Sequence, residues 1–148
     1  TTRENLTPFW KVDPRTGALA IVTKDFGGSA RVYLARRPAA GATTTLVRAR
    51  TLSLGIGEAV TAGSVSGDGR TVALRTYDRA YVWSRRGGES LTSALRRRPC
   101  SPRRSLFGEG QGEALALTRR GTAFLTVPEG GAPAIRRYAP ADSRSATP

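Results

Sequence analysis

Hydrophobic and polar residues alternate in short runs along this chain, most clearly between residues 60 and 85. Three short runs, at 60–65, 71–77 and 80–85, are separated by two tight turns. In the last run Tyr81 and Trp83 fall on one side and Val82 on the other, as in a β-strand, whose side chains point alternately to opposite faces. The stretch therefore predicts a three-stranded antiparallel meander.

The same unit occurs twice more, at a regular spacing. Gly17, Gly69 and Gly121 each end a turn between two apolar runs, and successive glycines are 52 residues apart. Glycine suits such turns because it accepts positive φ. A small antiparallel unit repeated about every 50 residues is typical of β-propeller blades. The chain is therefore predicted to be all-β, a partial β-propeller of about three blades of three to four antiparallel strands. An all-β sandwich with coincidental spacing is the alternative.

The predicted boundaries follow the repeat. The three blades cover residues 9–56, 57–105 and 106–139. Residues 1–8 form a lead-in, and the small, polar residues 140–148 form a disordered tail. Thr43 to Leu54 is predicted as the outer strand of the first blade. In the second blade the outer position is predicted to hold a short helix within 89–98, ending before Pro99.

Three blades are too few to close a ring, because propellers usually have four to eight. An open set would leave exposed sheet edges, which natural proteins avoid. We therefore expect the missing blades to come from the same parent chain or from a second copy of this chain that completes the ring. The sequence contains no methionine, which favours the first option, a piece or processed product of something longer.

Composition narrows the function classes only a little. The chain has 24 basic and 11 acidic residues, a net charge of +13, and nearly all the basic residues are arginine. This balance favours polyanionic partners, but it fits a high-GC bacterial genome equally well. No apolar run approaches the roughly 20 residues of a membrane span. The lone Cys100 cannot form an internal disulfide, and we interpret it as a surface thiol.

The absence of histidine excludes a Ser-His-Asp triad, a Cys-His pair and the usual zinc sites. Carboxylates remain, and the blade assignment places six of them on or near one propeller face. They are Asp25, Glu58, Asp78, Glu109, Glu113 and Glu129. A carboxylate-lined mouth suits a cationic ligand or calcium, with Asp78 and Glu113 as candidate metal ligands. The alternative is that these residues occupy exposed turns and pair with neighbouring arginines.

The arginines support a competing hypothesis, a surface that binds nucleic acid or another polyanion. The densest positive run is Arg96, Arg97, Arg98, Arg103 and Arg104, to which Arg119, Arg120, Arg136 and Arg137 add charge. No aromatic platform is interleaved with this run, which favours a solvated loop.

Residues 12–35, 65–84 and 111–130 resemble the later blades of a group of uncharacterised actinobacterial propeller proteins related to esterase-like phytase propellers. Glu113-Ala114-Leu115 keeps an inner-strand motif of that group, whereas the first unit has Phe9-Trp10-Lys11 there. The resemblance implies an exported, secreted or lipid-anchored bacterial protein. We interpret the chain as a ligand-binding or protein-binding module of such a protein. The alternatives are a calcium-assisted phosphoester or ester hydrolase and a polyanion binder.

Overall fold

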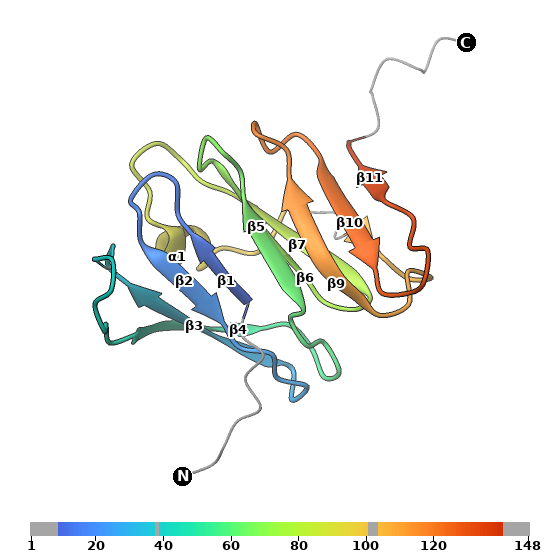
Figure 1. The fold of residues 1–148 in the computed structure, drawn as a ribbon, viewed down its shortest axis with the longest axis horizontal. Helices are drawn as coiled ribbons and strands as arrows, with labels where there is room; N and C mark the ends of the chain where they lie inside the picture. The colour runs from blue at the N-terminus through green and yellow to red at the C-terminus, as the bar shows by residue number, and fades with distance from the viewer. Residues whose placement is uncertain (1–8, 38, 101–103, 141–148) are drawn as a thin grey trace.

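The computed structural model describes residues 9–37, 39–100 and 104–140, which form three antiparallel sheets (Figure 1). The first sheet contains β1 (Phe9–Val12), β2 (Leu19–Val22), β3 (Ser29–Ala35) and β4 (Val47–Ser53). The second contains β5 (Ala62–Val65), β6 (Thr71–Arg75), β7 (Arg79–Ser84) and β8 (Arg104–Ser105). The third contains β9 (Gly112–Leu117), β10 (Phe124–Pro128) and β11 (Arg136–Tyr138). The predicted all-β class is confirmed, and these sheets do not close into a barrel. The predicted lead-in 1–8 and tail residues 141–148 lie outside the described residues.

Each sheet is a meander, with strands hydrogen-bonded in the order of the sequence. The turn between its first two strands is alike in all three sheets. Gly17, Gly69 and Gly121 stand in these turns with φ of 70°, 68° and 68°. Only glycine adopts this left-handed conformation without strain. The 52-residue spacing in the sequence therefore corresponds to one repeated turn in space.

The sheets stack face to face, with the second between the other two (Figure 1). Large side chains of the second sheet, such as Leu74 and Trp83, pack on the first sheet. Small ones, such as Ala62 and Ala73, pack on the third. The first strands of the sheets are neighbours, since β5 contacts both β1 and β9. The period-two pattern of Tyr81, Val82 and Trp83 is thus explained by a sheet buried on both faces.

Corresponding ends of the three sheets meet. At one end, which we call the turn end, lie the three glycine turns, and the N–H of Asp68 donates to the carbonyl of Arg119 (3.1 Å). At the opposite end, the loop end, lie the connections between successive strands at 23–28, 54–61, 76–78, 106–111 and 129–135. The hydroxyl of Thr61 donates there to the carbonyl of Gly112 (2.7 Å). Five of the six predicted acidic site residues belong to the loop end, and Glu113 is the second residue of β9.

The second sheet differs from the prediction at its outer edge. Helix α1 (Leu91–Ala94) is present, and Ser90 caps it by accepting from the N–H of Ser93. The fourth place in the sheet, however, belongs to β8, whose two residues pair with β7. Helix α1 instead packs Leu91 and Leu95 into the core between the first two sheets. In the described residues, no helix has the length and apolar character that crossing a membrane requires.

Candidate functional site

The loop end contains the six acidic residues predicted from the sequence, each contributed by a different connection or strand start. Their side chains do not form one open cluster, because most of them meet basic or hydroxyl partners. Within the described residues there is no group of three or more acidic or cysteine side chains that could hold a metal ion. Calcium binding by Asp78 and Glu113 therefore stays a prediction.

Glu109 is fully buried and pairs with the equally buried Arg75 of β6 (Nη1 to Oε2, 3.2 Å). The hydroxyls of Thr126 (2.8 Å) and Tyr138 also donate to its Oε1. Arg75 donates in addition to the carbonyl of Ala114 (3.1 Å). Burial, together with the Glu109 carboxylate, raises the pKa of the Tyr138 hydroxyl. These contacts join the second and third sheets, so the position of Glu109 is explained by packing.

Glu113 lies nearer the surface, where the three sheets converge. Lys24 of the first sheet donates to its Oε1 (2.9 Å), and the hydroxyl of Tyr77 approaches the same oxygen (3.4 Å). Lys24 lowers the pKa of Glu113 despite some burial. Tyr77 and then Glu113 raise the pKa of Lys24, whose ammonium lies 5.0 Å from the centre of the Tyr77 ring. The ring of Phe26 stacks with that of Tyr77, and the ring centres are 6.3 Å apart.

The remaining predicted residues are dispersed along the same end. Glu58 accepts from the hydroxyl of Thr76 and lies 3.4 Å from Arg79. Asp25 accepts from the N–H of Gly27 (2.8 Å) and lies 3.8 Å from Arg31. The carbonyl of Asp78 accepts from Leu106, and the N–H of Glu129 donates to Gln111. Four of the six residues therefore pair with basic residues, as the alternative interpretation of the sequence predicted. They are Asp25, Glu58, Glu109 and Glu113.

Two buried arginines were not singled out in the sequence. Arg75 ends the apolar run of β6, and Arg85 follows β7 at the turn end. Arg85 holds both oxygens of Asp13, at 2.9 and 3.1 Å. Burial would raise the pKa of Asp13, but the hydrogen bonds led by Arg85 outweigh it and lower the pKa below 3.8. The signal for Arg75 was an arginine inside an otherwise apolar strand, which predicts a buried partner.

The loop end also presents large hydrophobic side chains to solvent. Phe26, Ile56, Phe107 and Ile135 are 59%, 96%, 86% and 71% exposed, and they come from four different connections. Single exposed hydrophobic residues are ordinary on protein surfaces, but several at one end are characteristic of an interaction site. These four residues were not predicted from the sequence, in which only the acidic residues of these loops were singled out.

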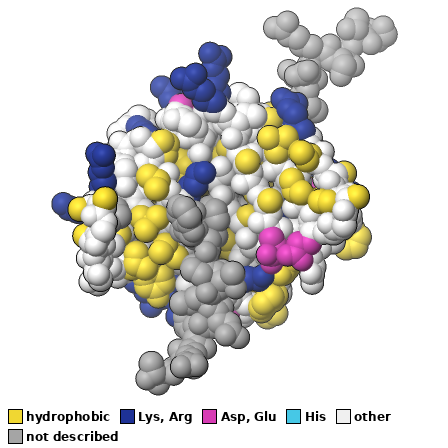
Figure 2. All heavy atoms as spheres, in the orientation of Figure 1, with side chains coloured by type: hydrophobic (Ala, Val, Ile, Leu, Met, Phe, Trp, Pro, Cys, Tyr) yellow, Lys and Arg dark blue, Asp and Glu magenta, His cyan; other side chains and the backbone are white. Residues whose placement is uncertain are grey.

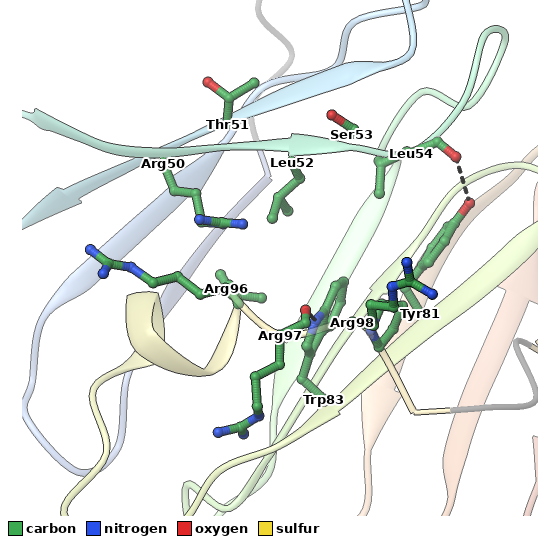
Figure 3. Close-up of a pocket in the computed structure, with 12 residues that line it drawn as sticks. Arg50, Thr51, Leu52, Ser53, Leu54, Tyr81, Trp83, Arg96, Arg97 and Arg98 are labelled. Atoms are coloured by element: carbon green, nitrogen blue, oxygen red, sulfur yellow. Dashed lines mark hydrogen bonds between the residues drawn. The ribbon is translucent and has the colours of Figure 1, made fainter.

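The predicted arginine run lies elsewhere, after helix α1. Its residues 96–98 line a pocket of about 490 Å³ between β4 of the first sheet and β7 of the second, which we call the arginine pocket (Figure 3). Arg50 and Leu52 of β4 point into it from one side, and Tyr81 and Trp83 of β7 from another (Figure 3). Arg103 lies outside the described residues, whereas Arg119 is in a turn of the third sheet and Arg136 and Arg137 are in β11. The arginine run therefore does not form one continuous positive stripe with the other arginines.

Comparison with known proteins does not name a family. No protein-family model matches this chain, and no curated protein matches its sequence.

Proposed function

We propose that the three sheets are consecutive blades of a β-propeller and that the chain is a binding module whose loop end contacts a protein partner. The blade assignment is supported by the repeated meander, by the left-handed glycine in the first turn of every sheet and by the neighbouring first strands β1, β5 and β9. In a propeller these first strands surround the central axis.

The outer faces of the end sheets support the same assignment. Directly opposite residues share a face of a sheet, so Leu19, Ile21 and Tyr33 lie on the face of the first sheet that points away from the second. Ala116, Leu125 and Val127 lie on the corresponding face of the third. Figure 2 shows hydrophobic side chains gathered over both end sheets. Two such faces fit further blades packed on either side.

The observation that carries the binding function is the set of exposed hydrophobic residues at the loop end. Phe26 and Phe107 are aromatic, and aromatic side chains are enriched at protein interfaces. The Lys24–Glu113 ion pair lies beside them and would form part of a polar rim. A small cationic ligand fits less well, because Glu58, Glu109 and Glu113 already have basic partners.

Selection of random peptides on the immobilised chain tests this function. Peptides enriched on the wild type are expected to be apolar and to lose roughly tenfold or more of their affinity for the double variant Phe26→Ser/Phe107→Ser, since central interface residues contribute most of the binding energy. The matched control is Val47→Ser, which removes a side chain that is 66% exposed on β4, away from these loops. Peptides that bind the double variant and the control equally well would place the binding surface elsewhere.

A further inference from the structure

The arginine pocket contains cationic groups that have no acceptor within the described part of the chain. The side chains of Arg50, Arg96 and Arg98 make no hydrogen bond or ion pair there, and Nε of Arg50 is buried. None of the 12 described residues that line the pocket is acidic. A buried donor without an acceptor is unfavourable, and in folded proteins such donors are rare. Among the described residues, the pocket therefore offers these guanidinium groups no carboxylate acceptor.

The base of the pocket is apolar and fixed in place. Leu52, Leu54 and Leu95 line it beside two aromatic rings. The indole N–H of Trp83 donates to the carbonyl of Arg97 (3.0 Å), and the hydroxyl of Tyr81 donates to the carbonyl of Leu54 (3.3 Å) (Figure 3). These hydrogen bonds fix the two rings at the base of the pocket, where each residue is at most 3% exposed.

We propose that the arginine pocket binds a small organic oxyanion, a carboxylate or phosphate attached to an aromatic or other apolar body. Guanidinium groups recognise both oxyanions through paired hydrogen bonds. A volume of about 490 Å³ lies within the range of small-molecule sites. The site lies between the first two sheets, includes only Leu54 from the loop end, and does not depend on the proposed blades.

A long polyanion fits the pocket less well than a small ligand does. Arg97 points away from the other arginines (Figure 3) and pairs with Glu89 and the carbonyl of Ser84. The arginine run is thereby interrupted in its middle. The remaining unpaired guanidinium groups surround a hollow, whereas a polyanion is usually contacted along an extended groove.

Isothermal titration calorimetry with four probes tests the ligand class. Benzoate and phenyl phosphate each combine an oxyanion with an aromatic body. The one that binds more tightly shows whether the pocket prefers a carboxylate or a phosphate. Benzamide lacks the charge and inorganic phosphate lacks the apolar body. We expect saturable binding of at least one aromatic anion, and roughly tenfold weaker binding or none for the two incomplete probes. Absence of saturable binding by both aromatic anions would overturn the proposal.

Variants locate the binding to the pocket. Arg50→Met and Arg96→Gln are each expected to weaken the aromatic anion roughly tenfold or more, because each removes a charged hydrogen bond. The control is Arg48→Gln on the same strand. A register shift in β4 sets Arg48 opposite Tyr33 and Arg50 opposite Val32, so the two arginines face opposite sides of the sheet.

Folding is checked separately in the ligand-free protein. Arg50→Met removes a buried donor that has no acceptor among the described residues, so its melting temperature is expected to equal or exceed that of the wild type. Arg96 is exposed, so Arg96→Gln tests the site without affecting the core. Equal affinity of the wild type, Arg50→Met and Arg96→Gln would overturn the proposal. A second result would also overturn it: the chain binds heparin alone, with a steep salt dependence, and Arg50→Met leaves this binding unchanged. That result would indicate an exposed polyanion surface.

Discussion

Arg75 places a cation at the end of an apolar strand, and it explains why Glu109 is not available to a ligand. Both side chains are fully buried. Taking a charge out of water is unfavourable, and the ion pair with its surrounding hydrogen bonds offsets this only while both partners are present. Gly112 is part of the same arrangement, because a Cβ there would lie 1.8 Å from Nη2 of Arg75.

Removal of one partner is expected to be strongly destabilising. Glu109→Gln leaves the guanidinium of Arg75 buried without a counter-charge, and we expect a loss of about 3–5 kcal/mol in the free energy of unfolding, measured with urea. The control Asp25→Asn breaks a surface pair at 3.8 Å and is expected to lose at most about 1 kcal/mol. The double variant Arg75→Met/Glu109→Leu should recover much of the loss. Equal losses for Glu109→Gln and Asp25→Asn would contradict this account.

At the same scale, the sequence predicted at which end of the sheets the acidic residues lie, but not which residues they contact. Glu58 and Glu109 each precede a recognisable strand, and Glu113 lies near the start of one. Their partners come from other parts of the chain: Lys24 is 89 residues from Glu113, and Arg75 is 34 residues from Glu109. A local pattern contains no information on such pairing, so a site built from loop positions alone overestimates the number of free carboxylates.

At the scale of the elements, the glycine turns determine how neighbouring sheets approach. A Cβ on Gly121 would lie 2.2 Å from Oγ1 and 2.5 Å from Cβ of Thr71, in the second sheet. Gly57, in a loop, has a comparable positive φ of 84° but open space around its Cβ position. Gly57 therefore requires glycine only for its positive φ, whereas Gly121 requires it also because the second sheet lies close by.

Alanine substitution at these two positions tests the difference. Gly57→Ala is expected to lose about 1 kcal/mol in the free energy of unfolding, the usual strain of a left-handed residue. Gly121→Ala adds a clash with a short side chain at the start of β6 and should lose roughly 1–3 kcal/mol more. Thermal or urea unfolding of both variants provides the measurement. If the two losses were the same, the third sheet would not depend on this close approach.

The repeated elements could be predicted from the sequence, whereas the irregular ones could not. Period-two patterns with glycine turns predicted the first two strands of every sheet, because burial on the faces produces that pattern. Strand β8 has only two residues and therefore no period. The register shift in β4 likewise leaves no mark in the pattern, although it decides that Arg50 faces the pocket.

At the scale of the whole molecule, the outer faces of the two end sheets make a prediction about association. Each carries apolar side chains beside an arginine, Arg48 on the first sheet and Arg137 on the third. The face of the first sheet differs from that of the third, so contact between copies would be head to tail, which gives either a closed ring or an open filament. Two copies would supply six sheets, within the four to eight of known propellers, whereas three copies would supply nine. Self-association should therefore stop at the dimer, about twice the monomer mass of 15.7 kDa.

Sedimentation equilibrium over a range of concentrations measures this association. Ile21→Asp and Leu125→Asp each place a charge on one outer face and are expected to return the chain to the monomer mass, because burying an unpaired carboxylate is strongly unfavourable. Thr45→Asp adds the same charge in an exposed loop between β3 and β4 and should leave the dimer intact. A wild type that is monomeric at every concentration would rule out a second copy as the partner. The exposed apolar side chains of that monomer should then bind the dye ANS more strongly in the wild type than in either Asp variant.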